Sequence, residues 1–525
     1  MPNKTPNSWE EELSQQTENV NMNQGLNDLS NGDTTDATDS GSVAKTTTAK
    51  PLDKSRGSIA SASGKSSVKL PGRSILARGN IEAAKAARAA DAVAKAQQAD
   101  VDDATLKEIY GEKREHVNVV FIGHVDAGKS TLGGSLLYCT GMVDDRTMEK
   151  VKREAKEAGC QSWYMSWVLD LTEEERTKGK TVSYVPHMIG GASQADLACL
   201  VISARKGEYE TGFEKGGQTR EHALLACNSG VQKLVIVVNK MDDPTVDWCK
   251  ARFDQCTAKV IKFLEALGYK KKDILCMPVS AQRTLGIKER IPKDVCHWYN
   301  GPSLLEYLTD FELPERKINS PFMMPVTSKY RDMGTMCEGR VESGVIKKNS
   351  SYLLMPNKTE VLISALYGET ENEISTASAG DQVRLRLRGV EEEDLLPGFV
   401  LCSPKRPVHC VHTFEAKIRI LDLKNILTAG FNCVMHVHSA VEEVTFAQLL
   451  HKLESGTGRK SKRPPSFVNK GQTIIARLEV TSAAGAVCVE EYTTLESMGR
   501  FTLRDQGQTI AIGMITKLIL GGNEH

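Results

Sequence analysis

An eight-residue glycine-rich turn, GHVDAGKS at residues 123–130, constrains this chain more than any other stretch of its sequence. Its spacing is G-x-x-x-x-G-K-[ST]; the apolar run VNVVFIG before it predicts a strand, and the residues after it predict a helix. In that context, backbone N–H groups and the positive end of the helix can hold phosphates. The turn therefore predicts a domain that binds a nucleoside triphosphate, with Lys129 on the β and γ phosphates and Ser130 as a Mg²⁺ ligand.

The residues after this turn predict a parallel sheet covered by helices. Three further apolar runs alternate with helical patterns: LACLVISA (197–204), KLVIVVNK (233–240) and ILCMPVSA (274–281). Alternating strands and helices of this kind are typical of α/β domains with a parallel sheet. We therefore expect a P-loop nucleotide-binding domain over residues 110–314.

The sequence NKMD at 239–242 predicts that the base is guanine. It ends a buried strand, at the edge of a doubly wound sheet where ligands bind. The Asp242 carboxylate can accept two N–H bonds from the edge of guanine, which adenine does not offer, and the backbone of Ala281 can contact the guanine oxygen. The predicted GTP or GDP contacts are Gly123, His124, Val125, Asp126, Ala127, Gly128, Lys129, Ser130, Thr131, Asn239, Lys240, Asp242, Ser280 and Ala281.

The stretch EERTKGKTV (174–182) lies between the first helix and the next strand, where a P-loop GTPase has its first switch. Its Thr181 hydroxyl is the expected second Mg²⁺ ligand beside Ser130. Taken alone, the same stretch is also compatible with a charged surface loop.

Beyond Pro314 the pattern changes to alternating polar and apolar residues, as in QVRLRLRGV (382–390) and FEAKIRIL (414–421). Each half of this region holds enough short strands to close a small barrel. We expect two antiparallel β-barrels, over residues 321–406 and 411–520.

Residues 1–109 have the composition of a disordered arm. They contain one aromatic residue, Trp9, and too few apolar side chains to offset the entropy of ordering. Acidic residues gather in 1–40 and basic residues in 41–98, so the arm could contact RNA, mRNA-associated proteins or an acidic partner, or could be a solvated tail. Residues 79–99 have the composition of an exposed helix.

The chain carries no sequence signal for a membrane, for secretion or for zinc. No uncharged apolar run reaches the length of a membrane span, and the N-terminus lacks a secretory pattern. The 13 cysteines include no CxxC pair, and His409, His412, His436 and His438 have no zinc spacing. We expect a cytoplasmic protein with reduced thiols.

Three stretches carry a family resemblance: FIGHVDAGKSTLGGSLLY, MIGGASQADLACLVISARKGEYETGFEKGGQTREH and VVNKMDDPTVDW. Through them the chain resembles the elongation-factor-1-alpha-like translational GTPases over residues 108–520. Among them it resembles the GTP-binding release factors of eukaryotes, through SWYMSWVLD, KSKRPPSFV and GRFTLRDQGQTIAIG. The resemblance implies a GTPase domain followed by two barrels that promotes GTP-dependent peptide release at the ribosome, with a stop-codon-reading class 1 release factor as its partner. A ribosome-rescue GTPase is the alternative within the same superfamily.

The resemblance also implies that the last barrel holds the partner contact. The residues carried over as the docking segment are Gly499, Arg500, Phe501, Thr502, Leu503 and Arg504. Because Phe501 and Leu503 alternate as core residues do, the same segment can instead be a strand that closes the barrel. The basic turn at 456–465 can meet RNA or simply be solvated.

One departure from the family pattern affects the chemistry. No D-x-x-G sequence occurs anywhere in the chain, and only fourteen residues, 182–195, separate Thr181 from Asp196. The family has Asp-Ala-Pro-Gly-His just before the residues that match Ser183 onward, and that segment holds the Mg²⁺ shell, senses the γ-phosphate and orients the attacking water. The sequence reads as though one segment had been removed between Val182 and Ser183, through an alternative transcript, a gene-model error or a true loss. We therefore predict no catalytic residue and very slow hydrolysis, with His187 a poor substitute, so a non-hydrolysing binding module is a second hypothesis.

Overall fold

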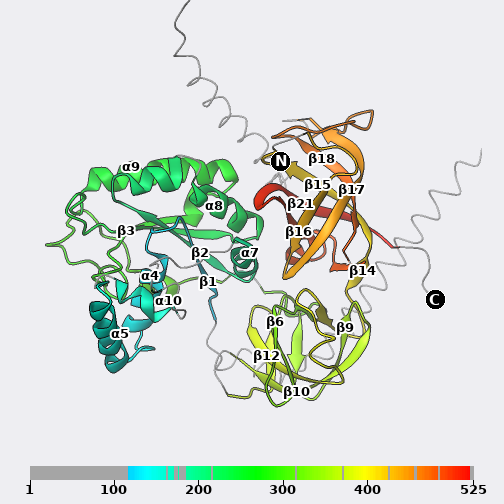
Figure 1. Ribbon diagram of the computed structural model, residues 1–525, viewed down its shortest axis with the longest axis horizontal. Helices are drawn as coiled ribbons and strands as arrows, with labels where there is room; N and C mark the ends of the chain where they lie inside the picture. Colours follow the sequence, from blue (N-terminus) through cyan, green and yellow to red (C-terminus); the bar gives the residue numbers. More distant parts are fainter. Residues whose placement is uncertain are drawn as a thin grey trace, which may run out of the picture.

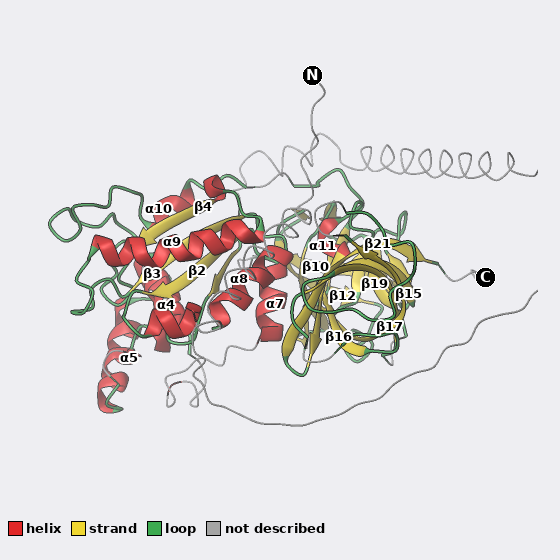
Figure 2. Ribbon diagram, turned by 90° about the horizontal axis from the view of Figure 1, so that it is seen from above, coloured by secondary structure: helices red, strands yellow, loops and turns green. Residues whose placement is uncertain are grey.

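The computed structural model describes residues 116–160, 163–170, 176, 185–214, 217–313, 316–368, 372–423, 426–454, 458–482 and 485–520. The expected arm at 1–109, its helix at 79–99 and Thr181 lie outside the described residues. Within them the chain forms an α/β domain followed by two all-β domains, as the sequence predicted. Figure 2 shows the helices gathered in the α/β domain and the strands dominating the rest.

The α/β domain is built on a four-stranded parallel sheet in the order β1-β2-β3-β4. These strands are Val119–Ile122, Leu197–Ser203, Lys233–Asn239 and Ile274–Pro278. The α-helices are α4 (Lys129–Cys139), α5 (Asp145–Glu157), α7 (Val185–Ser193), α8 (Gln218–Asn228), α9 (Lys250–Leu267) and α10 (Leu304–Thr309), with the short 3-10 helices η2 (Ser166–Val168) and η4 (Lys271–Asp273) and the π-helix η3 (Glu210–Glu214).

Alternate strand residues face opposite sides of this sheet and give it two cores. Leu200 and Ile236 pack with α8 and α9 on one side, whereas Val201 and Val237 pack with α4 and α10 on the other. Figure 1 shows α8 and α9 on one side of the sheet and α4 and α10 on the other. The near-continuous apolar runs in the sequence follow from burial on both faces.

The first all-β domain has a seven-stranded antiparallel sheet in the order β5-β13-β9-β10-β12-β7-β6, beside the pair β8-β11. The sheet encloses one core that includes Phe322, Leu354 and Leu385. The strands are Met323–Pro325, Ser328–Arg331, Thr335–Arg340, Val345–Lys347, Ser351–Met355, Thr359–Tyr367, Thr376–Ser378, Gln382–Arg388 and Val400–Cys402, β5 to β13 in chain order.

The second all-β domain is a closed barrel in the order β15-β18-β17-β16-β20-β21, with Phe414, Phe446 and Phe501 buried inside it. A separate two-stranded sheet, β14-β19, and the short helix α11 lie at its edge. The elements are β14 (His409–Val411), β15 (Thr413–Ile420), β16 (Asn432–Val437), β17 (Ala440–Leu453), β18 (Thr473–Val480), β19 (Val487–Val489), α11 (Glu496–Gly499), β20 (Arg500–Asp505) and β21 (Gln508–Ile519).

Polar contacts join the α/β domain to the first all-β domain. Arg340 on β7 forms an ion pair with the buried carboxylate of Asp196. The Gln194 Nε2 donates to Thr327 Oγ1 at 2.9 Å. An apolar cluster that includes Met323, Cys402 and Met498 joins the two all-β domains. Among the described residues, no helix is long and apolar enough to cross a membrane.

Candidate nucleotide-binding site

The glycine-rich turn connects β1 to α4 and requires glycine at both glycine positions of its motif, Gly123 and Gly128. Gly123 and Gly128 have φ values of 142° and 91°. A Cβ on Gly123 would lie 2.2 Å from the Val201 carbonyl oxygen, and one on Gly128 would lie 2.3 Å from Asn239 Nδ2. The turn therefore packs against the ends of both β2 and β3, with no room for a side chain.

The first turn of α4 presents a positive helix end to the cleft. Lys129 begins the helix, the N-cap Gly128 offers no side-chain acceptor, and the first turn holds no acidic residue. The N–H groups at a helix start lack intrahelical partners and favour an anion in front of them. This end of α4 has the properties of a phosphate site.

The Lys129 ammonium is partly buried against the turn, and within the part of the chain that the structure describes no ion pair joins it to a carboxylate. Its Nζ donates to the carbonyl oxygens of Gly123 and His124 at 3.1 and 2.8 Å. Burial lowers the pKa of Lys129 to about 8, against the opposing charge of Asp126. A phosphate oxygen at this position would provide a negative charge for the partly buried ammonium.

Asn239 ties three separate segments together at the end of β3. Its Nδ2 donates to the Ala127 carbonyl at 3.0 Å, and its Oδ1 accepts from the Ala281 N–H at 3.0 Å. The Ser135 Oγ on α4 in turn donates to the Ala281 carbonyl at 2.5 Å. The two predicted loops, 123–130 and 280–281, are thus joined through one buried amide.

Asp242 lies at the rim of the cleft, and the sequence predicts that it binds the guanine base. Its carboxylate pairs with Arg283, whose side chain is 67% exposed, at 3.3 Å. Lys240, in the left-handed region at φ 61°, extends its Nζ to Glu208 Oε2 at 2.8 Å. A base that bonds to Asp242 would compete with an exposed arginine, a weak partner in water.

These elements surround a cleft of about 490 Å³, large enough for a small-molecule ligand. Nine predicted residues line it: Val125, Asp126, Gly128, Lys129, Ser130, Thr131, Asn239, Lys240 and Asp242. Gly123, His124, Ala127, Ser280 and Ala281 do not line it; Gly123, Ala127 and Ala281 lie behind it, in contact with lining residues. The other lining residues, which the sequence did not single out, are Trp163, Ser166, Asp170, Arg205, Glu208, Asp243, Pro244, Gln282 and Arg283.

A charge network that the sequence did not suggest closes one side of the cleft. Arg205 forms ion pairs with Asp243 and with Glu208, and Glu208 also accepts from Ser203 Oγ at 2.7 Å. Its members follow β2 and β3, whose carboxyl ends meet at this edge. No fixed spacing connects them in the sequence, so only the fold could have identified them.

His222 on α8 also supports the glycine-rich turn, and the sequence did not reveal this contact. Its Nδ1 accepts from the Gly123 N–H at 3.3 Å, and the residue is buried. Burial, together with the nearby Lys129 charge, lowers the pKa of His222 to about 4. The neutral imidazole therefore holds the start of the glycine-rich turn and binds α8 to it.

The expected docking segment lies in the structure as follows. Gly499 ends α11, and residues 500–505 form β20, where Phe501 and Leu503 belong to the barrel core. Asn228 Nδ2 on α8 donates to the Phe501 carbonyl at 3.2 Å and to Thr502 Oγ1 at 2.9 Å. Arg504 Nη1 lies 3.9 Å from Glu221 Oε1. The segment is a barrel strand covered by α8, and its role in partner binding stays a prediction.

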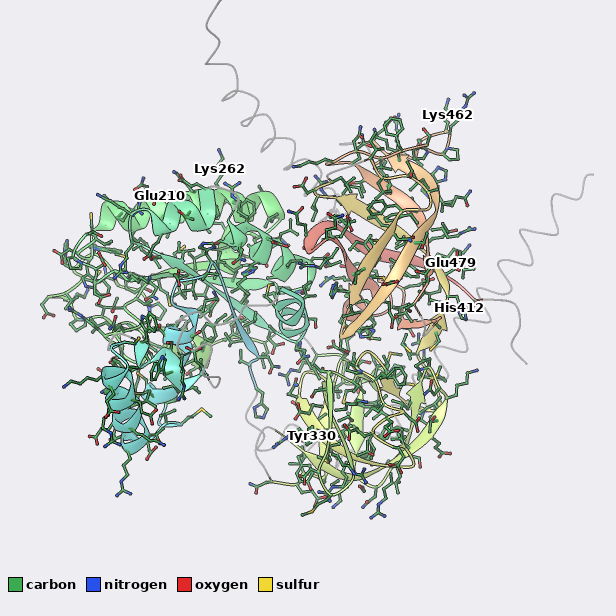
Figure 3. All side chains as sticks on the ribbon, in the orientation of Figure 1. Glu210, Lys262, Tyr330, His412, Lys462 and Glu479 are labelled. Atoms are coloured by element: carbon green, nitrogen blue, oxygen red, sulfur yellow. The ribbon has the colours of Figure 1, made fainter. Side chains whose placement is uncertain are left out.

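Two other sequence features have simple surroundings. Burial lowers the pKa of His436 and of His438 to about 4, and His409 pairs with Glu490 at 2.9 Å. In the part of the chain that the structure describes, no group of three or more His, Cys, Asp or Glu side chains could hold a metal. Figure 3 shows Lys462 projecting outward from the basic turn.

Comparison with protein families matches all three domains. Residues 114–185 and 182–314 match the elongation factor Tu GTP-binding domain, in two pieces that overlap at residues 182–185. Residues 334–402 match elongation factor Tu domain 2, and residues 413–516 match the GTP-eEF1A C-terminal domain-like family.

Individual relatives are similar over most of the chain. The eukaryotic peptide chain release factor GTP-binding subunit of Candida maltosa is 58% identical over 454 residues, which cover 82% of this chain and 63% of the relative. Its counterpart in Zygosaccharomyces rouxii is 54% identical and covers 83% of this chain and 69% of the relative. The solved structure of sup35 complexed with GDP is 52% identical, covers 80% of this chain and 98% of that one, and has a TM-score of 0.38. The chain spans just under two thirds of the length of the first of these relatives.

Proposed function

The chain belongs to the eukaryotic peptide chain release factor GTP-binding subunits, and we propose that it acts in translation termination as the guanine-nucleotide-binding partner of a class 1 release factor. The observation that carries this proposal is the cleft at the end of the parallel sheet. There the glycine-rich turn, Asn239 and the loop at 280–281 are fixed together, and Asp242 stands at the rim.

The residues of the cleft divide the work of holding GTP or GDP. The turn and the start of α4 direct N–H groups at the phosphates, and Lys129 exchanges its two carbonyl partners for phosphate oxygens. The Asp242 carboxylate leaves Arg283 to accept the N–H groups of guanine. Asn239 does not need to reach the ligand, because its two hydrogen bonds already place the loops that do.

Mg²⁺ fits this site through a hydroxyl ligand rather than through a carboxylate cluster. Ser130 lines the cleft on the first turn of α4, and we assign Thr181 as the second protein ligand. When bound, the ion would neutralise charge on the β and γ phosphates.

Selectivity for guanine provides the test of this cleft. Isothermal titration of the full chain should show GTP and GDP binding, with ATP much weaker because adenine leaves the Asp242 charge unsatisfied. Equal affinities for GTP and ATP would rule out the guanine site. Loss of all binding in Lys129→Ala, with the fold unchanged by circular dichroism, would support the phosphate assignment.

A non-hydrolysing form of the same factor is the second candidate. The absence of D-x-x-G from the sequence favours it, as does the break in the GTP-binding-domain match at 182–185. A cleft without the water-orienting segment still binds nucleotide but lacks most of the positioning on which phosphoryl transfer depends. Hydrolysis should then be slower by about 10³-fold or more.

Single-turnover GTP hydrolysis on ribosomes with the class 1 factor separates the two candidates. Hydrolysis at the rate of a full-length relative would exclude the non-hydrolysing form. If hydrolysis is slow, inserting between Val182 and Ser183 the D-x-x-G segment that the family has and this chain lacks should restore activity.

The partner itself is tested by co-precipitation of the full chain with a class 1 release factor and with a tRNA-shaped ribosome-rescue factor. Capture of the rescue factor alone would move the chain to ribosome rescue. We assign the cytoplasm as the site of action because ribosomes are the proposed target, and we assign contacts with mRNA-associated proteins to residues 1–109.

A further inference from the structure

Two cysteines meet at the junction of the two all-β domains. Cys410 on β14 lies directly opposite Cys488 on β19 in the antiparallel register, and their Sγ atoms are 3.2 Å apart. Figure 1 places β14 between the two all-β domains. All 13 cysteines lie within the described residues, and each is a free thiol. Among the hydrogen bonds of those residues, the one between Cys410 and Cys488 joins two sulfur atoms.

The backbone at this pair already satisfies the geometry of a disulfide. Opposed residues of an antiparallel pair have Cα atoms about 4.5 or 5.5 Å apart, and both values fall inside the range of about 4.4–6.8 Å seen in disulfides. The sulfurs need to approach by only about 1 Å, which side-chain rotation can supply.

Polar contacts on both strands hold this register. The buried Glu490, just after β19, accepts from His409 Nδ1 at 2.9 Å. On the other side, His438 Nε2 lies 2.9 Å from the Cys488 carbonyl, and burial keeps that imidazole neutral by lowering its pKa to about 4. The two thiols are therefore held facing each other by their neighbours.

The two thiols differ in access and in acidity. Cys488 is 2% exposed, whereas Cys410 is only partly buried. The hydrogen bond from Cys488 lowers the pKa of the Cys410 thiol and raises that of Cys488, while the nearby Lys358 charge favours the Cys410 thiolate. By contrast, burial raises the pKa of the isolated Cys433 to about 12. Cys410 is thus the sulfur that would react first with an oxidant, and Cys488 the sulfur that would then form a disulfide with it.

We propose that Cys410 and Cys488 are a site of reversible oxidation by a peroxide. The Cys410 thiolate attacks one peroxide oxygen, so that an S–O bond forms, the O–O bond breaks and hydroxide leaves. The Cys488 sulfur then forms an S–S bond with Cys410 and displaces its hydroxyl group, which combines with the proton of the Cys488 thiol and leaves as water. In total, two thiols lose two electrons and two protons, and hydrogen peroxide is reduced to two waters.

The cross-link would tie the strand that leaves the first all-β domain to the strand that precedes α11 and β20. The loop that it closes contains β15 to β18, four of the six strands of the barrel. Oxidation would therefore fix the start of β20 relative to the domain junction. This inference is independent of nucleotide and partner binding.

Peptide mapping of the intact full-length chain tests the proposal. Trypsin releases Cys410 in residues 406–417 and Cys488 in residues 478–500, each the single cysteine of its peptide, and cleavage after Lys405 separates Cys402 from Cys410. After brief treatment with hydrogen peroxide and capping with maleimide, the linked pair of peptides should be the major product. The chain should lose two maleimide-reactive thiols, and dithiothreitol should restore both.

Two variants make the order of attack testable. Cys488→Ser should leave Cys410 as a sulfenic acid that dimedone labels, at a level well above wild type, whereas Cys433→Ser should form the disulfide as wild type does. Peptides 406–417 and 478–500 that remain unlinked in oxidised wild type would overturn the proposal. So would a disulfide between Cys410 and Cys402.

Discussion

Raising the pH should weaken nucleotide binding through loss of the proton on Lys129. Burial holds the pKa of the free lysine near 8, below its ordinary value of 10.5. A bound triphosphate reverses this shift, because its negative charge stabilises the ammonium. Between the pKa of Lys129 in the free protein and its higher pKa in the complex, nucleotide binding requires Lys129 to take up a proton. The affinity for the nucleotide therefore falls as the pH rises.

The magnitude follows from the protonated fraction of the free protein. With a pKa of about 8, roughly nine in ten lysines carry the proton at pH 7 and roughly one in ten at pH 9. The bound form stays protonated at both values, so Kd for GTP should rise about tenfold, which corresponds to about 1.4 kcal/mol.

The assay is fluorescence titration of a labelled GTP analogue at pH 7, 8 and 9. Lys129→Arg is the matched control, because a guanidinium stays charged across this range and the ligand's own titration is the same for both proteins. The variant should bind more weakly but with less dependence on pH. Parallel pH curves for wild type and Lys129→Arg would refute the reasoning.

Three further outcomes test the cleft. Gly128→Ala should lower the free energy of unfolding by about 2–4 kcal/mol in urea titrations, because its φ is 91° and its Cβ would clash with Asn239. The control Gly141→Ala, whose Cβ would have no atom within 4 Å, should lower it by only about 1–2 kcal/mol. Equal losses in the two variants would contradict the close packing of Gly128. Asn239→Ala should destabilise by about 2–4 kcal/mol because it leaves the buried Ala127 carbonyl and Ala281 N–H without this partner, and an unchanged melting temperature would remove its bridging role. Asp242→Asn should weaken GTP binding by about 1–3 kcal/mol, whereas ATP binding should not weaken, because the variant no longer sets an unsatisfied charge against adenine; a comparable loss for both nucleotides would argue against a base contact.

Local sequence was sufficient to predict the parts of the cleft that come from strand ends. In a parallel sheet the carboxyl ends of all strands share one edge, so the turn after β1, Asn239 at the end of β3 and Ala281 after β4 had to meet. The motif spacing identified each loop, and the structure joins them through the Asn239 amide.

The remaining contacts depend on distances between elements, which no local pattern encodes. His222 reaches the Gly123 N–H across 99 positions in the sequence, and Arg205 reaches Asp243 across 38. The alternation of Phe501 and Leu503 correctly indicated core positions, but nothing in the sequence showed that α8 covers the intervening Thr502.

The burial of β20 has a consequence for any protein that would recognise it. Phe501 and Leu503 belong to the barrel, while Thr502 and Arg504 contact α8, so the strand has no unoccupied side. A partner for this strand would be a competitor of the chain's own α/β domain. Its apparent affinity would equal its intrinsic affinity multiplied by the fraction of molecules in which α8 has moved away.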